Sequence, residues 1–413
     1  MDDTDETAGT DGGTARFRDI LAVREFRAVW LAELQSVLGD QLARVALSVL
    51  VFQRTGSAAW PALTYALTYL PDLVGGPLLG GLADRFPRRA VMVTADLLRA
   101  LLVAVLAIPG LPLPVLAVVL VVVQLANAPF SSAQAAVVPA VLDGSRYVLG
   151  QSLLKITNQV GQLAGFAVGG AVIALIGPGL GLAADAVTFG VSAVVLALGV
   201  RSRPAADERA ERVSTLRRLA AGAGTIWRDP RLRALVGLAW LAGFVIVPEG
   251  LAVPYAAEIG GGAATAGLLL AAHPAGIVLG VFALGRWVPD AVRLRLVGPL
   301  AAGAVVPLLG YAFKPGLGVT VVLLLVSGAC AAYQVTASTT FMRLVPDAER
   351  GQAFGLAGSG LIAVQGIGLI AGGVVVARLG SPSVTIAVIA AAGVVTAVPV
   401  ALSWRRTYRS VTS

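Results

Sequence analysis

Long apolar stretches follow one another along the whole chain, and short polar or glycine- and proline-rich segments separate them. Each stretch suits a helix of about 20 residues, the length that crosses the hydrocarbon core of a bilayer. Breaks such as PGLPLP at 109–114, IGPG at 176–179 and RLGSPS at 378–383 end several stretches. The pattern predicts an all-α membrane protein with twelve transmembrane helices at 26–53, 58–82, 90–108, 113–139, 150–176, 180–200, 232–257, 263–284, 294–312, 317–343, 351–377 and 382–404.

Composition strengthens this prediction and narrows the function. The 413 residues are 57% hydrophobic and only 13% charged, against about 25% charged in a soluble domain. A soluble enzyme, a nucleic-acid-binding protein and a disulfide scaffold are therefore excluded. The single Cys330 lies in an apolar stretch, and paired cysteines, H-E-x-x-H and G-x-x-x-x-G-K-[ST] patterns do not occur. We expect no metal, no cofactor and no ATP-driven chemistry.

Basic residues indicate the orientation. Arg54, Lys314 and Arg378 fall in loops on one side, Arg44 and Arg99 lie within predicted helices, and the rest of the 31 Lys and Arg residues lie on the side of both termini. Basic loops stay cytoplasmic. Both termini are therefore predicted to be cytoplasmic. Because the composition is rich in alanine, glycine and arginine and poor in lysine, we expect the plasma (inner) membrane of a bacterium.

The longest loop divides the chain into two parts of six predicted helices. We expect a disordered cytoplasmic tail at 1–15, an N-terminal bundle at 16–200, a cytoplasmic linker at 201–231, a C-terminal bundle at 232–404 and a short tail at 405–413. The acidic N-terminus lacks the basic start of a secretory signal. The linker sequence STLRRLAAGAGTIW predicts an amphipathic helix at the membrane surface. No coiled coil is predicted, so we expect a monomer.

The loop between the second and third predicted helices reads GGLADRFPRRAVM, residues 80–92. It resembles the signature loop of the major facilitator superfamily, G-x-L-A-D-R-x-G-R-K, although Pro87 replaces the usual glycine. The matching residues include Gly80, Asp84, Arg85, Arg88 and Arg89. The resemblance implies a gating role for this loop, in which arginines would also anchor to anionic headgroups.

A second resemblance lies in the fifth predicted helix, in GQLAGFAVGG at 161–170. It is similar to the family's antiporter motif, G-x-x-x-G-P-x-x-G-G, with Phe166 in place of proline. Gly161, Gly165, Gly169 and Gly170 match. The simpler interpretation is close helix packing by small residues.

Similarity to the family covers nearly the whole chain. Segments LGDQLARVALSVLVFQRTGS, ADLLRALLV and ANAPFSSAQAAVVPAVL resemble the branch with enterobactin exporters and macrolide-efflux proteins. The arginine that multidrug antiporters carry in the fourth helix is missing, and Arg99 in the third is the nearest candidate. The family implies two six-helix bundles, related by pseudo-symmetry, that alternate access to a central site.

Two carboxyl groups are the candidates for proton coupling. In the first predicted helix, Glu33, Asp40 and Arg44 share one face. Asp40 either pairs with Arg44 and fixes the helix, or takes a proton or a cationic substrate. In the seventh, Glu249 follows Pro248 within VPEGLAVP, which predicts a broken helix of the kind that forms sites and gates in transporters.

Glu33, Arg44 and several other polar residues in predicted helices are candidates for a substrate cavity. Tyr65, Tyr69 and Asp72 share a face that suits an organic cation or simple packing. His273 is either a pH-sensitive group or a helix–helix hydrogen-bond partner. The neutral candidates, which would also serve as interhelical hydrogen-bond partners, are Gln124, Asn127, Asn158, Gln162, Gln334 and Gln365.

Three further charged residues complete the set. Asp96 and Arg99 lie three residues apart, and we expect them to join Asp84 and Arg85 in a charge cluster that latches a gate. Asp185 is expected near the outer end of its helix, reaching toward water.

These features favour a proton-coupled exporter of hydrophobic or amphipathic small molecules such as antibiotics, secondary metabolites or siderophores. Its partners would be the lipid bilayer, protons and the transported molecule, with no nucleic acid. The alternatives are an importer or lysophospholipid flippase on the same fold, and a sensor that transports nothing.

Overall fold

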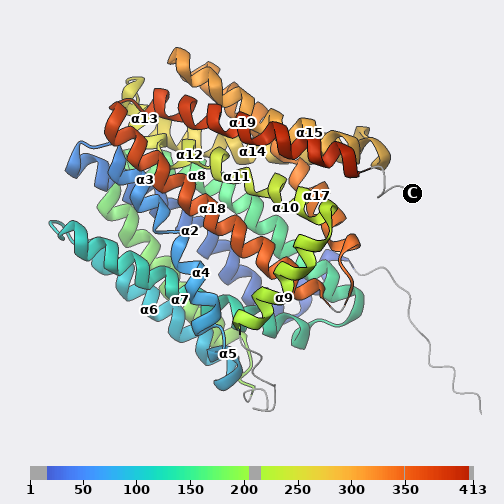
Figure 1. Cartoon of the computed structure of the whole chain (residues 1–413). Helices are drawn as coiled ribbons and strands as arrows, with labels where there is room; N and C mark the ends of the chain where they lie inside the picture. The colour runs from blue at the N-terminus through green and yellow to red at the C-terminus, as the bar shows by residue number, and fades with distance from the viewer. Residues whose placement is uncertain (1–15, 204–214, 348, 409–413) are drawn as a thin grey trace, which may run out of the picture.

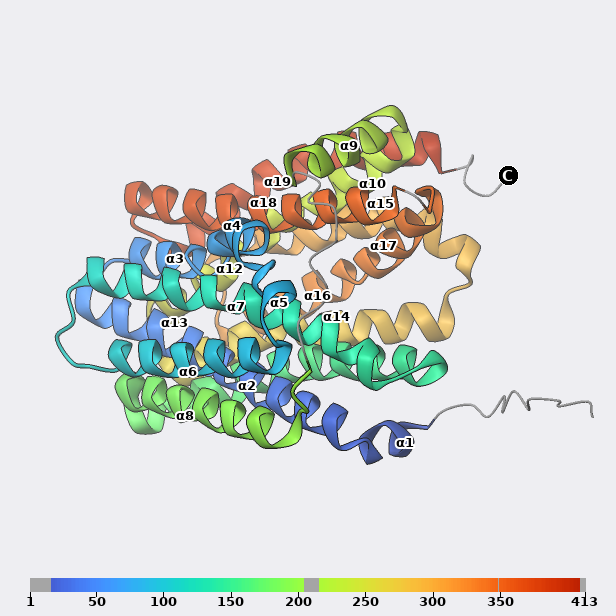
Figure 2. The same ribbon diagram turned by 90° about the horizontal axis from the view of Figure 1, so that it is seen from below.

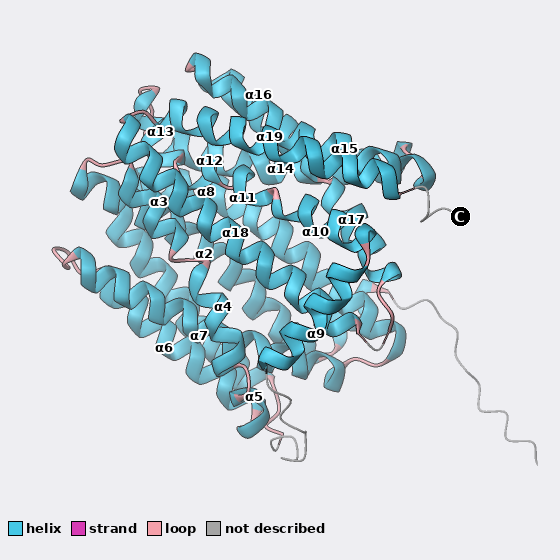
Figure 3. Ribbon diagram, viewed as in Figure 1, coloured by secondary structure: helices cyan, strands magenta, loops and turns pink. Residues whose placement is uncertain are grey.

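The computed structural model describes residues 16–203, 215–347 and 349–408. The predicted tail at 1–15, the linker residues 204–214 and the chain end at 409–413 lie outside the described residues. Within the described part, every regular element is a helix (Figure 3). The all-α architecture predicted from the apolar pattern is therefore confirmed.

The first half of the chain carries eight helices. The segments predicted up to residue 200 account for all of them except the two short helices α1 and α5. These are α1 Phe17–Ala22, α2 Arg24–Thr55, α3 Ala59–Ala66, α4 Leu70–Leu79, α5 Leu82–Arg85, α6 Arg88–Leu106, α7 Leu113–Val141 and α8 Gly144–Gly199. The helix α2 ends at Gly56, which has a φ of 61°. Glycine adopts this left-handed conformation without the steric penalty of a Cβ atom.

The second half carries the remaining helices. They are α9 Thr215–Arg228, α10 Pro230–Trp240, α11 Ala242–Val245, α12 Val247–Gly250, α13 Ala252–Glu258, α14 Ala263–Trp287, α15 Asp290–Val305, η1 Val306–Phe313, α16 Leu317–Ala331, α17 Tyr333–Leu344, α18 Arg350–Leu379 and α19 Pro382–Thr407. Figures 1 and 2 show the two halves as two groups of helices that lie side by side.

Nine helices within the described residues are long and apolar enough to cross a membrane. The predicted second helix is not among them because it is broken between α3 and α4. The predicted third helix, α6, is not among them because its 19 residues include the charged Arg88, Arg89, Asp96 and Arg99. The predicted fifth and sixth helices count once, as α8. The count of twelve crossings therefore remains a prediction, although each predicted segment is helical over most of its length.

The 56 residues of α8 form two arms. A straight helix of that length would measure about 84 Å, far more than a bilayer. Gly177 interrupts it with a φ of 79°. A Cβ atom on Gly150 would lie 3.1 Å from the Phe26 ring, and one on Gly199 would lie 2.3 Å from the Ala28 side chain. Both ends of α8 thus lie beside the start of α2, so the arms are antiparallel.

The bundle has two ends. The termini end holds the start of α2 and the end of α19, and the far end holds the turns at 56–58, 259–262 and 380–381. The two halves meet through α8 and α14, and through α3 and α18. A Cβ atom on Gly267 would lie 2.5 Å from the Cα atom of Gly170, and one on Gly373 would lie 3.3 Å from the Ala59 carbonyl oxygen. The halves therefore pack together toward the far end.

The amphipathic helix predicted in the linker is α9, and it packs against the start of α18. A Cβ atom on Gly222 would lie 2.5 Å from the Gln352 carbonyl oxygen, and Thr225 Oγ1 donates a hydrogen bond of 2.5 Å to Glu349 Oε2. This helix is thus attached to the second half.

Candidate functional site

A polar cavity of about 80 Å³ lies inside the first half. Its polar lining comes from α2, α4, α6, α7 and the second arm of α8, together with Thr68 between α3 and α4. The polar and charged lining residues are Asp40, Arg44, Thr68, Asp72, Arg99, Gln124, Asn127 and Asp185. Five predicted helices therefore bring ionisable or amide groups to one place. We call it the central cavity.

Arg99 is held from several sides. It forms an ion pair with Asp96, and both side chains are buried. Ser192 Oγ donates a hydrogen bond of 2.5 Å to Asp96 Oδ2. The guanidinium lies 4.6 Å from the ring centre of Phe130 and 4.5 Å from that of Phe189, in cation–π range. A buried ion pair with extra partners keeps both charges at fixed positions.

In the structure, Arg99 lines the central cavity and Asp96 is paired with it. The loop residues that were expected to join them, Asp84 and Arg85, are exposed. Arg88 instead donates a hydrogen bond of 2.8 Å to the Ala136 carbonyl oxygen, which ties the loop to α7.

Asp40 and Arg44 both line the central cavity, but no ion pair within 4.0 Å joins these two described residues. The direct pairing that their spacing suggested is not formed. The Arg44 guanidinium lies instead 5.8 Å from the ring centre of Tyr65 and 5.5 Å from that of Tyr69. Two aromatic faces hold the cation, and Asp40 forms no ion pair within 4.0 Å among the described residues.

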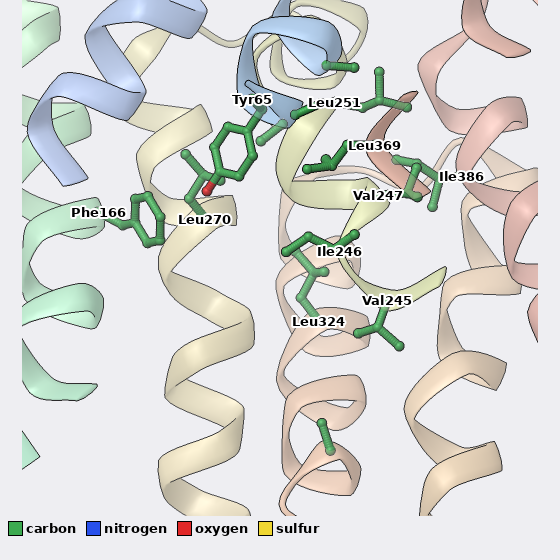
Figure 4. Packing of buried hydrophobic residues seen from close by; sticks show 14 of the residues in the cluster. Tyr65, Phe166, Val245, Ile246, Val247, Leu251, Leu270, Leu324, Leu369 and Ile386 are labelled. Carbon is green, nitrogen blue, oxygen red and sulfur yellow. The ribbon is translucent and has the colours of Figure 1, made fainter. Parts of the chain in front are cut away.

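Tyr65 connects the two halves. Its hydroxyl group donates a hydrogen bond of 3.1 Å to Glu249 Oε2 in α12. The ring is only 1% exposed, and Figure 4 shows it among Leu251, Leu270 and Leu369 of the second half. The short helices around Glu249 confirm the broken helix predicted from VPEGLAVP. A series of polar side chains thus leads from the central cavity through Arg44 and Tyr65 to Glu249.

Asp185 is the functional candidate that sequence reasoning misplaced. Its side chain is 1% exposed and lines the central cavity, so it does not reach toward water. A helix-face argument could have found it, because Asp185, Phe189 and Ser192 are spaced four and three residues apart and share one face. All three contribute to the surroundings of the cavity or of Asp96.

The remaining carboxyl and glycine candidates have structural partners. Glu33 accepts a hydrogen bond of 2.9 Å from Gln134 Nε2, a residue that the sequence did not single out. Three glycines of the antiporter-like motif face α2, since Cβ atoms on Gly161, Gly165 and Gly169 would approach Val37, Gln41 and Leu42. Gly170 faces the second half. The packing interpretation of the motif therefore fits the structure.

Other predicted cavity residues lie apart from the central cavity. Gln334 lines a separate, largely apolar pocket of about 130 Å³ between α10, α17 and α18. His273 is half-buried in α14, and its Nε2 atom has no hydrogen-bond partner. Asn158 is exposed on α8. Of the predicted amides, Gln162 and Gln365 are half-buried and line none of the described pockets.

The fold and the site define a helical membrane protein with charged groups enclosed between helices. Among the described residues, no group of three or more His, Cys, Asp or Glu side chains is arranged to hold a metal ion. The sequence profile of the Major Facilitator Superfamily matches residues 29–255, more than half of the chain. The chain belongs to this family and is a multi-pass membrane transporter rather than an enzyme.

A curated relative is macrolide efflux protein A of Streptococcus pyogenes, which is 32% identical over 99 residues. That alignment covers 24% of this chain and 24% of the relative, so the chain spans about a quarter of the length of the curated relatives that it matches.

Solved transporter structures share the fold over almost the full length. A variant of the nucleoside transporter NupG has a TM-score of 0.69 at 16% identity and covers 93% of this chain and 99% of its own. A POT family transporter in complex with 5-aminolevulinic acid has a TM-score of 0.71 at 13% identity, with coverages of 94% and 97%. A bacterial homolog of the human lysosomal transporter Spinster, inward-facing and occupied, has a TM-score of 0.69 at 15% identity, with coverages of 96% and 98%.

Proposed function

We propose that the protein is a proton-coupled exporter of hydrophobic or amphipathic small molecules, such as a drug, a secondary metabolite or a siderophore. The observation that carries the proposal is the hydrogen bond between Tyr65 and Glu249, which joins a carboxyl group of one half to the other half. A proton that binds this carboxylate removes its charge. Since hydrogen bonds to charged groups are the stronger ones, protonation would weaken the link between the halves.

The proposed direction of transport rests on a relative and on the distribution of charge. The matched segment of macrolide efflux protein A favours export. The basic residues concentrated at the termini end favour a cytoplasmic location for that end, in the plasma membrane of a bacterium. The membrane potential contributes about 2.3 kcal/mol per charge per 100 mV. One proton exchanged for a neutral compound would use this energy, whereas exchange for a monovalent cation would respond only to the pH gradient.

Proton flux in liposomes tests the proposal directly. The full chain is reconstituted with an interior pH dye, a pH gradient is imposed, and lipophilic cations, macrolides and catecholate siderophores are added in turn. We expect one compound class to move protons with the wild-type protein, and Asp40→Asn or Glu249→Gln to abolish the signal. The matched control is Asp143→Asn, an exposed carboxyl group at the termini end.

The other outcomes each contradict part of the proposal. Labelled compound that crosses without proton movement would contradict proton coupling. Flux in the opposite direction would indicate an importer or a flippase. If neither protons nor any compound cross, the protein would be a sensor rather than a transporter.

The close approach of α8 and α14 yields a prediction about the closed far end. In Gly267→Leu, the new side chain would collide with backbone atoms of Gly170, 2.5 Å from the Cβ position. Overpacking of this kind costs about 1–3 kcal/mol, which corresponds to a shift of roughly five- to hundredfold toward states with the far end open.

Spin labels at Ser57→Cys and Leu379→Cys, in a Cys330→Ser background, would report the distance across the far end. We expect a longer distance in Gly267→Leu and no change in Gly285→Leu, because no atom lies within 4 Å of a Cβ position on Gly285 in the same helix. An unchanged distance distribution in Gly267→Leu would show that this contact does not limit closure.

A further inference from the structure

Asp185 lies on the second arm of α8, against the backbone of α2. A Cβ atom on Gly39 would lie 2.2 Å from Asp185 Oδ1 and 2.5 Å from Thr188 Oγ1. Only a residue without a Cβ atom leaves room for the carboxyl group here. Gly39, the residue before Asp40, therefore lets the Asp185 carboxyl group lie against α2. The carboxyl groups of Asp40 and Asp185 both line the central cavity.

The Asp185 carboxyl group is incompletely bonded. Oδ1 accepts a hydrogen bond of 3.1 Å from Thr188 Oγ1, whereas Oδ2 is buried and has no partner. No ion pair of Asp40 or Asp185 occurs among the described residues. A buried carboxylate without a partner is costly, and it is stabilised by a cation or becomes neutral by binding a proton.

The groups around the cavity carry more negative than positive charge, so Asp40 and Asp185 lack a cation of their own. Arg99 is already bound to Asp96, and Arg44 lies against two tyrosine rings. On the packed helix α14, His273 is not among the residues that line the cavity. The titratable or charged groups that line the cavity are Asp40 and Arg44 on α2, Asp72 on α4, Arg99 on α6 and Asp185 on α8. The charged or titratable groups that interact with these are Glu33 on α2, Tyr65 on α3, Tyr69 just before α4, Asp96 on α6 and Glu249 on α12. Carboxyl groups outnumber guanidinium groups.

We propose that Asp40 and Asp185 form one proton-binding site, in which two neighbouring carboxyl groups hold a single shared proton when no cation occupies the central cavity. Two carboxylates at one site repel each other, so one of them retains a proton. A cavity of about 80 Å³ has room for water, so the proton can exchange between a carboxyl oxygen and solvent. No other bond forms or breaks.

The site also defines the kind of ligand that would displace the proton. A protonated amine or another monovalent organic cation supplies the one positive charge that the pair lacks. This role in exchange rests on the proposed function, whereas the shared proton itself can be measured without transport.

Infrared pH-difference spectra of the full chain in lipid nanodiscs test the site, because protonated carboxyl groups have a distinct carbonyl band. We expect Asp185→Asn to remove the one-proton component and Asp40→Asn to shift its titration, because the buried Asp185 carboxyl group is then no longer repelled by its neighbour. The double variant should remove no more than Asp185→Asn alone. Asp143→Asn, with its exposed carboxyl group, is the control.

Two results would overturn the proposal: the full band in Asp185→Asn, or an unshifted band in Asp40→Asn. If the Asn variants do not fold, Gly39→Ala supplies a second test. Its new methyl group displaces the Asp185 carboxyl group, so the band should shift, whereas Gly190→Ala, with open space at its Cβ position, should leave it unchanged. An unshifted band in Gly39→Ala would also overturn the proposal.

The liposome experiment separates this proposal from the proposed function. If the band behaves as expected but no compound moves protons, the site stands and the exporter proposal fails. If compounds move protons equally well in wild type and Asp185→Asn, and the band is also unaltered in that variant, the exporter proposal stands and the shared site is wrong.

Discussion

Replacing Arg99 by methionine is expected to lower the free energy of unfolding by about 3–5 kcal/mol, because it leaves Asp96 buried without its partner. Asp96 has no solvent exposure, and Ser192 would be its only remaining polar contact among those that the structure shows. The stacking of the guanidinium against Phe130 and Phe189 would be lost as well. Unfolding in mixed micelles, followed by circular dichroism, measures the change.

A double variant and a variant at an exposed arginine are the controls for this prediction. In Asp96→Asn/Arg99→Met both charges are gone, and replacing a whole buried ion pair is often close to neutral. We therefore expect most of the lost stability to return in the double variant. Arg286→Met, at an exposed arginine, should have little effect. A loss below about 1 kcal/mol in Arg99→Met would mean that water reaches Asp96 and that the pair is not enclosed.

Removing the hydroxyl group of Tyr65 is expected to open the far end. A hydrogen bond to a charged group contributes about 1.5–3 kcal/mol. Tyr65→Phe should therefore shift the equilibrium between closed and open far ends by roughly ten- to hundredfold. The ring stays in place and keeps its contact with Arg44, so the change isolates the hydrogen bond to Glu249. Spin labels at Ser57→Cys and Leu379→Cys report the populations.

Glu249→Gln completes the test as a double-mutant cycle. The glutamine keeps an acceptor oxygen but loses the charge, so we expect a smaller shift than in Tyr65→Phe. The two changes together should exceed Tyr65→Phe only slightly, because both act on one interaction. Tyr147→Phe, near the termini end, is the matched control. Independent, additive shifts would show that Tyr65 and Glu249 do not act as one contact between the halves.

The sequence predicted the helical membrane architecture because hydrophobic length is a local property. Every span of about 20 apolar residues must satisfy its own backbone hydrogen bonds in lipid, so it becomes a helix wherever it lies in the chain. The loop at 80–92 identified the family, which the profile match at residues 29–255 shows. The break around Glu249 was also readable, since Pro248 and Gly250 flank it and helices α11 to α13 are short.

The tertiary structure decided which charges meet. Asp40 and Arg44 have the spacing of an ion pair, yet Arg44 turns to Tyr65 and Tyr69 on another element. Arg99 and Asp185 are 86 residues apart, and only the packing of α6 against α8 brings both to the central cavity. Helix periodicity fixes the face on which a side chain lies, but the neighbour of that face depends on packing between distant segments. The sequence by itself therefore determined the class of protein and its candidate ionisable groups, while their partners followed from close approach at glycines such as Gly39 and Gly170, where a missing Cβ atom lets another helix come near.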